Sequence, residues 1–262
     1  MIEFLDVAPL KSPVIFDSHA HYYDEKFDLF RDKLLELLPH HGVAGVINCG
    51  CDIDSSLQSL ELADKYDYMY AAVGIHPENL QSNSSLEQIE SLSKHKKCIA
   101  IGEIGLDYYW TQDTKAWQKE VFEQQIILAK KLDLPIIVHD RDAHADTLDL
   151  LLKHKPKGVL HSFSGSVEMA REVTKIGMYI GIGGVITFKN AKKLPEVVKN
   201  LPIDRILLET DAPYLAPVPY RSKINNSAMI YLTAQKVAEL CDTDIDSLLT
   251  ACLSNTKKLF GI

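Results

Sequence analysis

The chain lacks any long apolar run, and this absence excludes a membrane-spanning helix. A helix that crosses a bilayer needs about 18 or more consecutive apolar residues, and the apolar runs in these 262 residues are all shorter. The N-terminal segment MIEFLDVAPLKSPVIFD also lacks the basic-then-apolar order of a secretory signal peptide. We therefore expect a cytosolic (cytoplasmic) protein with no membrane partner.

Cysteine is also scarce, and acidic residues outnumber basic ones by 36 to 28. The five cysteines, at positions 49, 51, 98, 241 and 252, are odd in number and scattered, which is typical of reduced thiols and not of a disulfide framework. Cys49 and Cys51 are separated by one residue, so we interpret them as buried strand thiols and not as half of a zinc ribbon. The net charge of −8 argues against a protein that coats duplex DNA, so any contact with nucleic acid must be local.

No linker rich in proline, glycine or serine and no repeat divides the sequence, so we expect a single domain over residues 1–262. What the sequence does contain is an alternation of short β-branched apolar runs with longer amphipathic segments, typical of βα units around a parallel sheet. A (β/α)8 TIM barrel, an α/β fold of about 250 residues, fits this pattern. The expected strands are Val14–Phe16, Ala44–Cys49, Met69–Val73, Cys98–Ile101, Pro135–Val138, Gly158–Leu160, Met178–Ile182 and Arg205–Leu208.

Helices are expected between these strands. Gly42 and Gly177 lie where a helix is expected to end before the next strand begins. The segment from Asp244 to Ile262 predicts an extra C-terminal helical segment packed on the outside of the barrel. The expected helical segments between strands are 27–41, 55–66, 85–94, 117–132, 145–154, 166–176, 194–201 and 229–241.

Half of the ten histidines follow apolar runs, whereas the others lie in polar segments and share no common setting. Imidazoles and carboxylates at the carboxyl ends of several strands are what a catalytic metal centre in a barrel requires. Six of the eight expected strands contribute, which favours a closed ring over an open doubly wound sheet, whose site draws on two or three strands. The strand-end residues are His19 and His21 in IFDSHAH, His76 in AAVGIH, Glu103 in IAIGE, His139 in PIIVH, His161 in GVLH and Asp211 in ILLETD.

One cation is expected at the first strand. His19 and His21 are two residues apart, so both rings project from the same face of a strand and can bind one ion. Asp211 lies beside this strand if the ring is closed, and we expect it to be a ligand and the base that accepts a proton from metal-activated water. Asp17, on the same face, is expected to orient a ligand histidine.

A second cation is expected beside the first. The Glu103 carboxylate can bridge two cations, which an imidazole cannot do. His139 and His161 arrive from the next two strands and complete the second site. Such a pair of sites accepts Mg, Mn, Zn, Ni or Co.

The chain resembles a known family in the stretches DSHAH, GIHPE, GEIGLDYY, PIIVHDRDA, HSFSG, ETDAPYLAP and NTKKLFGI, which run from about residue 14 to the C-terminus. These stretches are similar to those of the TatD-type metal-dependent deoxyribonucleases, which belong to the wider group of amidohydrolase-like barrels. The resemblance implies a phosphodiesterase that uses hydroxide made with two divalent cations. It implies His19, His21, Glu103 and Asp211 around one ion, Glu103, His139 and His161 around the other, and Asp211 and Glu103 as catalytic carboxylates.

DNA ends or small phosphodiesters are the expected substrates. An acidic protein with a deep, metal-lined mouth is expected to act as a 3′-to-5′ exonuclease on single-stranded or frayed ends. His76 and Arg141 could contact phosphate oxygens, and the aromatic residues 108–110 could stack on a base. Where the family usually has a stretch like RGKRNEP, this chain has RSKINNS: Arg221, Lys223 and Asn225 match as substrate-binding candidates, and Ser222, Ile224, Asn226 and Ser227 do not, which affects substrate affinity and selectivity but not the chemistry.

Two other functions stay open. A metal-dependent amidohydrolase or aminoacyl-ester deacylase would use a similar barrel, but many such enzymes have a carboxylated lysine at the position of Glu103. Here the nearby Lys96 and Lys97 lie at the opposite end of the strand. A non-catalytic scaffold is the third hypothesis, although such degeneration normally removes ligands and none is missing. We expect a monomer or a weak oligomer.

Overall fold

Eight parallel strands form the centre of the molecule. The computed structural model describes residues 14–81, 85–110 and 112–262. The strands pair in sequence order from β1 to β8, and a bridge between Ala20 and Ala212 joins the two edges of the sheet into a ring. The predicted TIM barrel is therefore confirmed. Its strands are β1 Ile15–Ala20, β2 Val43–Cys49, β3 Met69–Val73, β4 Cys98–Asp107, β5 Ile136–Arg141, β6 Gly158–Leu160, β7 Tyr179–Ile182 and β8 Ile206–Leu208.

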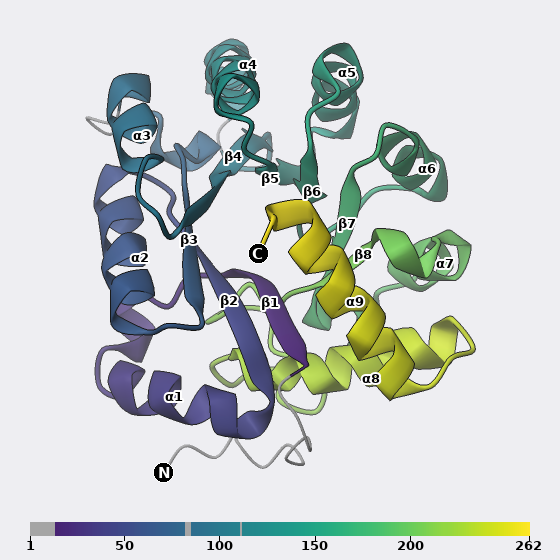
Figure 1. Cartoon of the computed structure of the whole chain (residues 1–262). Helices are drawn as coiled ribbons and strands as arrows, with labels where there is room; N and C mark the ends of the chain where they lie inside the picture. Colours follow the sequence, from purple (N-terminus) through teal and green to yellow (C-terminus); the bar gives the residue numbers. More distant parts are fainter. Residues whose placement is uncertain (1–13, 82–84, 111) are drawn as a thin grey trace.

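Helices surround this ring (Figure 1). The expected helix over 27–41 is wrong in extent, because Pro39 has no N–H with which to continue α1, and 3-10 helices at Glu25–Phe27 and Leu38–His41 flank it. The others lie close to their predicted positions. The helices are α1 Arg31–Leu37, α2 Ile53–Lys65, α3 Leu86–Leu92, α4 Lys115–Leu132, α5 His144–His154, α6 Val167–Lys175, α7 Lys193–Asn200, α8 Ile230–Leu240 and α9 Ile245–Phe260.

Side chains at the helix ends explain where several helices begin. An N-cap oxygen accepts a backbone N–H of the first turn, which no residue within the helix could pair. Asp52, Ser85, Ser166 and Asp244 do this for α2, α3, α6 and α9. Gly177 has a φ of 95°, which a residue without a side chain adopts at low cost, and it separates α6 from β7 as expected.

Three strands extend further than predicted. The apolar runs of β1, β4 and β5 were expected to end at Phe16, Ile101 and Val138, but the strands continue to Ala20, Asp107 and Arg141. The additional residues are largely polar, so a criterion based on apolar runs stops before them. As a result, His19, Glu103 and His139 lie within strands and not just after them.

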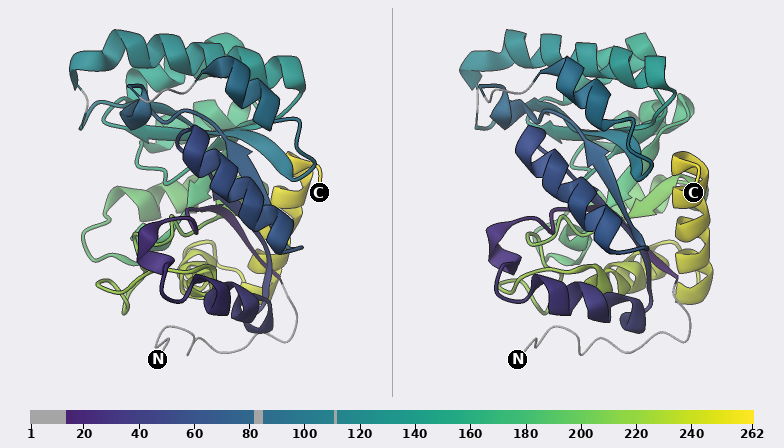
Figure 2. Two further views of the ribbon diagram at one scale, coloured as in Figure 1. Left: turned by 90° about the vertical axis from the view of Figure 1, so that its left-hand side faces the viewer. Right: turned by 60° about the vertical axis from the view of Figure 1, so that its left-hand side comes forward.

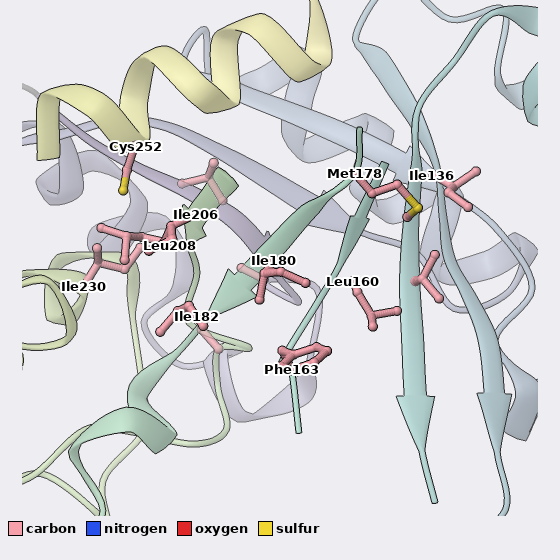
Figure 3. Close-up of a cluster of buried hydrophobic side chains, with 14 of the residues drawn as sticks. Ile136, Leu160, Phe163, Met178, Ile180, Ile182, Ile206, Leu208, Ile230 and Cys252 are labelled. Atoms are coloured by element: carbon pink, nitrogen blue, oxygen red, sulfur yellow. The ribbon is translucent and has the colours of Figure 1, made fainter. Parts of the chain in front are cut away.

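The hydrophobic core has two layers. The outer layer combines residues of the helices with one face of the strands, and Figure 3 shows Ile206 and Leu208 of β8 near Ile230 of α8 and Cys252 of α9. The interior cluster contains no residue from α1 to α8, so it fills the barrel itself. Its residues include Phe16, Ile47, Ile137, Val159, Tyr179 and Leu207, together with Phe260 from α9.

The C-terminal helix α9 closes one end of the barrel. Its Phe260 joins the interior cluster, and the helix packs on β1, on β8 and on residues 203–205, which precede β8. Figure 2 shows α9 packed at one end of the strands. The C-terminal segment that was predicted to pack on the outside of the barrel therefore covers the amino ends of the strands. None of the helices in the described part of the chain is long and apolar enough to cross a bilayer.

Candidate metal centre

A pocket of about 1010 Å³ opens at the carboxyl ends of the strands, opposite α9. Its volume lies near the upper end of the usual range of ligand sites, about 300–1,000 Å³. All six predicted ligands gather here from five strands and the residues just after them. His21, Glu103, His139, His161 and Asp211 line the pocket, and His19 lies fully buried beside them.

Four of these side chains converge in what we call the first cluster. Nε2 of His19 lies 3.0 Å from Nε2 of His21 and 3.2 Å from Oε2 of Glu103. Oδ1 of Asp211 lies 3.7 Å from Nε2 of His19 and 3.3 Å from Nε2 of His21. Ligand atoms about 2.0–2.1 Å from a tetrahedral cation are about 3.3–3.4 Å apart. The separations therefore suit the coordination shell of a single ion.

The partners of His21 leave its inward nitrogen free to bind a cation. Nδ1 of His21 lies 2.9 Å from the carbonyl oxygen of Cys49, which can only accept, so Nδ1 carries the hydrogen of the neutral ring. Nε2 then presents a lone pair to the first cluster. A carbonyl behind the ring is a common way for proteins to fix the tautomer of a metal-binding histidine.

A second cluster surrounds the other oxygen of the same glutamate. Oε1 of Glu103 lies 3.0 Å from Nδ1 of His139 and 2.8 Å from Nε2 of His161. These two nitrogens are 3.4 Å apart, again close to the spacing around one cation. Glu103 therefore reaches both clusters, one with each carboxylate oxygen.

Two carboxylates that the strand-end pattern missed support the second cluster. Nε2 of His139 donates to Oδ2 of Asp107 at 3.1 Å, which leaves Nδ1 of His139 free for a cation. Oε1 of Glu209 lies 3.6 Å from Nδ1 of His161 and accepts the backbone N–H of Ser162 at 2.5 Å. Carboxylates in this position orient ligand histidines and make them more basic.

His76 also faces Glu103, but as a donor. Its Nδ1 accepts the backbone N–H of Glu78 at 3.2 Å, so the neutral ring carries its hydrogen on Nε2. That Nε2 lies 3.5 Å from Oε1 of Glu103. A protonated nitrogen cannot bind a cation, but it can donate to a carboxylate or to a substrate oxygen. The predicted contact with a substrate phosphate stays a prediction, now with a defined donor atom.

The charges of the two clusters suit divalent cations. Burial alone would raise the pKa of Glu103, but the neighbouring His161, His19 and His76 rings outweigh it and hold that pKa well below its usual range. Burial would lower the pKa of His161, but Glu103 and Glu209 raise it well above its usual value. The carboxylates thus draw positive charge into the site, and a divalent cation can supply that charge in place of the ring protons.

Asp211 combines an ionised carboxylate with access to the pocket. Burial would raise its pKa, but the hydrogen bond with His21 and the nearby His19 outweigh this and lower it. Its side chain is 21% exposed, against 4% for Glu103. Its backbone has a φ of 60°, a left-handed conformation, and its N–H donates to the carbonyl of His19 at 3.0 Å. This carboxylate can therefore meet both a bound ion and a water molecule in the pocket.

Comparison with known proteins decides the family, because residues 16–261 match the family model described as TatD related DNase. The chain belongs to the TatD family. A Bacillus subtilis (strain 168) relative, the uncharacterized metal-dependent hydrolase YabD, is 41% identical and covers 95% of this chain and 100% of its own. The uncharacterized metal-dependent hydrolase YcfH of Escherichia coli (strain K12) is 35% identical, over 95% of this chain and 96% of its own.

A solved structure agrees with this assignment. The crystal structure of YjjV, a TatD homolog from Escherichia coli K12, has a TM-score of 0.91 with this chain and 32% identity, covering 95% of this chain and 99% of that one. The chain is thus a TatD-family metal-dependent hydrolase with a TIM-barrel fold, as the resemblance implied.

A buried network positions the loop that carries Asp211 in this TatD-family chain. Oδ1 of Asp17 accepts the backbone N–H of Thr210 at 3.0 Å, and Oδ2 is 2.7 Å from the hydroxyls of Thr210 and Ser227. Burial raises the pKa of Asp17 to about 7, although these hydrogen bonds lower it. Asp17 also accepts the backbone N–H of His19 at 3.2 Å, so it contacts the backbone of a predicted ligand and not its ring as expected, and it holds β1 to the chain after β8.

Asn225 takes part in the same support. It is fully buried, and its Nδ2 donates to the carbonyl oxygens of Thr210 at 2.9 Å and Tyr214 at 2.8 Å. A side chain with no accessible surface cannot touch a ligand, so the expected substrate contact by Asn225 is wrong. The residue instead braces the loop between β8 and α8.

The three predicted cationic substrate residues are exposed and divided between two pockets. Arg141 lines the metal-centre pocket, with its guanidinium carbon 4.2 Å from the ring centroid of Tyr109 and 5.5 Å from that of Trp110. Arg221 and Lys223 line a smaller pocket beside it. The sequence alone could not show this separation.

Cys51 departs from its expected role. It lies beyond the end of β2, lines the metal-centre pocket and has its Sγ 3.9 Å from Oε2 of Glu103. The hydroxyl of Tyr23 donates to the same sulfur at 3.3 Å. Only Cys49 is the buried strand thiol that was predicted.

Proposed function

We propose that this chain is a deoxyribonuclease that uses two divalent cations and removes nucleotides in the 3′-to-5′ direction from single-stranded or frayed DNA ends. The observation that carries the proposal is the Glu103 carboxylate, which presents Oε2 to the first cluster and Oε1 to the second. Two-cation sites of this kind are typical of enzymes that break phosphodiester bonds, because both the attacking and the leaving oxygens need stabilisation.

When bound, the two cations supply Lewis acidity and lower the pKa of a water molecule from 15.7 toward about 7. Asp211 is the proton acceptor of the proposed reaction, since its lowered pKa keeps the carboxylate ionised at neutral pH. Nε2–H of His76 donates to a phosphate oxygen, and the hydrogen bond from Glu78 to Nδ1 fixes that tautomer. Glu103 would hold one cation with each carboxylate oxygen, since Oε2 faces the first cluster and Oε1 the second.

The rim of the pocket supports a single-stranded substrate. Trp110 and Tyr109 are 62% and 50% exposed, and the Arg141 guanidinium lies against both rings. Flat exposed groups of this kind stack on unpaired bases, whatever the base. Tyr108 does not belong to this surface, because it is buried and its hydroxyl donates to Asp146 at 2.7 Å. Because the candidate metal centre is recessed and the chain is acidic, a single-stranded DNA end that can enter the pocket is favoured over the interior of a duplex.

Nothing in the site favours an amide substrate. A carboxylated lysine would replace Glu103, but Lys97 lies at the amino end of β4, where its Nζ donates to the carbonyl oxygen of Asp67 at 2.7 Å. Hydrolysis of an aminoacyl ester is tested in the same assay. The scaffold hypothesis predicts no turnover of any substrate.

The experiment uses purified protein loaded in turn with Mg, Mn, Zn, Ni or Co, with elemental analysis to count the ions. Single-stranded oligonucleotides labelled at the 5′ or the 3′ end, closed circular duplex and an aminoacyl ester are compared in parallel. We expect two ions per chain and stepwise shortening from the 3′ end. Equal degradation of the closed circle would contradict the preference for ends, and ester hydrolysis without DNA cleavage would replace the proposal with a deacylase.

A further inference from the structure

A second pocket adjoins the metal centre on the β8 side. Its volume is about 420 Å³, which lies within the usual range for small-molecule sites. Tyr214 and Leu215 line both this pocket and the metal-centre pocket, so they form a shared wall between the two. They follow Asp211 closely in the chain. A ligand at the metal centre can therefore extend over this wall.

The second pocket is cationic, although the chain as a whole is acidic. Lys26, Arg221 and Lys223 line it, and none of the described residues that line it is Asp or Glu. The chain has a net charge of −8. Three positive side chains around a pocket without an acid create a local positive potential, which attracts an anion and repels a cation.

Aromatic rings hold two of these cations in place. The guanidinium carbon of Arg221 lies 3.8 Å from the ring centroid of Phe188, and Nζ of Lys26 lies 3.9 Å from that of Tyr214. The hydroxyl of Tyr214 donates to Oδ2 of Asp24 at 2.7 Å, which fixes the shared wall. Stacking of this kind restricts the rotamers of long side chains before a ligand arrives.

Apart from Ser222, the remaining surface of the second pocket is largely apolar. Phe188, Leu215, Ile224 and Pro213 contribute to its lining. A ligand that suits both parts has an anionic group and a flat apolar body. A nucleotide has this composition, with a phosphate for the cations and a base for the apolar surface.

We propose that the second pocket binds the nucleotide next to the one being released, with its phosphate between Lys26 and Arg221. This inference rests on the proposed nuclease function. It implies that the substrate strand crosses the metal centre from the Trp110 side to the Arg221 side. It also implies that a substrate needs a second phosphate to be cleaved well.

The test compares thymidine oligonucleotides that differ by one phosphate. TpT contains only the phosphate that is cleaved, whereas TpTpT has one more phosphate for the second pocket. We measure kcat/KM for each with the metal-loaded enzyme. We expect the native enzyme to prefer TpTpT by about tenfold, the value of a charge-assisted contact with one phosphate. Arg221→Ala and, separately, Lys26→Ala should reduce this ratio, and Arg221→Lys should restore part of it.

The control removes a cation at the other end of the barrel. Lys157 directly precedes β6, is exposed and pairs with Asp133, so Lys157→Ala changes the net charge equally without touching either pocket. Its ratio should equal that of the native enzyme. Salt gives a second readout: for a longer single strand, the slope of log affinity against log salt should fall by about 0.7 in Arg221→Ala.

The outcomes separate the two proposals. If native enzyme cleaves both substrates and Arg221→Ala and Lys26→Ala leave both values of kcat/KM unchanged, the second pocket is not a subsite while the nuclease function stands. An equal loss for TpT and TpTpT in these variants would also overturn the subsite, because it would place the residues at the metal centre. If native enzyme cleaves neither substrate with any cation, the proposed function itself fails.

Discussion

The two ends of the barrel use the same strands for opposite purposes. On β5, Ile137 belongs to the apolar interior cluster, and His139, two residues later, belongs to the second metal cluster. Val159 of β6 and His161, directly after this strand, make the same change. Residues two apart on a strand face the same side. On β5 and at the end of β6, the same face of the chain therefore changes from packed apolar core to polar site within two residues.

The difference shows where stability and function reside. The base of the barrel is apolar and is closed by α9, so its burial stabilises the fold. The mouth contains buried polar atoms without a hydrogen-bond partner in the described part of the chain, among them Nδ1 of His19, Nδ1 of His161 and Oε2 of Glu209. Unpaired buried polar groups cost stability. Changes at the mouth should therefore affect activity, and changes at the base should affect folding.

The largest effect is expected from Glu103→Gln at the mouth. The amide cannot bridge two cations, so metal-dependent hydrolysis should fall to the level of the chelated enzyme and the ion count should drop below two. Circular dichroism should show that the fold persists. Glu90→Gln is the matched control, because Glu90 pairs with Lys131 on the outer surface. Unchanged turnover in Glu103→Gln, or in His139→Ala, would contradict the two-ion assignment.

Phe260→Ala should have the complementary effect at the base. Phe260 is 6% exposed and joins α9 to the interior cluster. Removing a buried phenyl ring costs about 3–5 kcal/mol of unfolding free energy, which denaturant titration measures. Turnover per folded molecule should stay at the native value, because the metal centre lies at the other end. A comparable loss of turnover in fully folded protein would show that the two ends are coupled.

Glu209→Gln tests the support behind the mouth. Glu209 is 1% exposed, and a side chain at Gly181 would collide with its carboxylate, so the barrel wall is shaped around it. Loss of a carboxylate behind a ligand histidine typically weakens metal affinity by about 10–100-fold. Competition with a chelator measures this affinity. Asp204→Asn, just before β8 at the base, is the control and should leave the affinity unchanged.

The smallest effect is expected from Asp244→Ala at the base. Asp244 caps α9 by accepting the backbone N–H of Ser247 at 2.8 Å, and hydrogen bonds from the side chain and the backbone of Ser247 lower the pKa of Asp244 below its usual value. A carboxyl group whose pKa is lower in the folded state stabilises the fold at any pH above its unfolded-state pKa. This stabilisation is lost as the pH falls through its folded-state pKa. The variant should melt slightly below the native protein at pH 7, and the difference should shrink as the Asp244 carboxylate becomes protonated at low pH. A difference that persists at low pH would exclude the charge as its cause.

The two-residue periodicity of strands predicted which side chains would face the candidate metal centre, but it was not continued past the apolar run of each strand. The spacing of His19 and His21 correctly placed both rings in one cluster. Asp107 lies four residues after Glu103 on β4, and Glu209 lies two residues before Asp211, so the same rule could have found both. They were missed because each strand was expected to end with its apolar run. Inside a barrel that holds a polar site, strands continue into polar residues.

The amino-acid sequence was enough to predict the TIM barrel and the six candidate ligands that gather at its mouth, because apolar alternation and strand period are local properties. Only the tertiary structure assigned the two oxygens of Glu103 to different clusters and His76 to a donor role. Only the tertiary structure also showed that Asn225 is buried and that Arg221 and Arg141 line different pockets. These features depend on distances between strand ends, which are set when β8 closes against β1 and not by any neighbour in the chain.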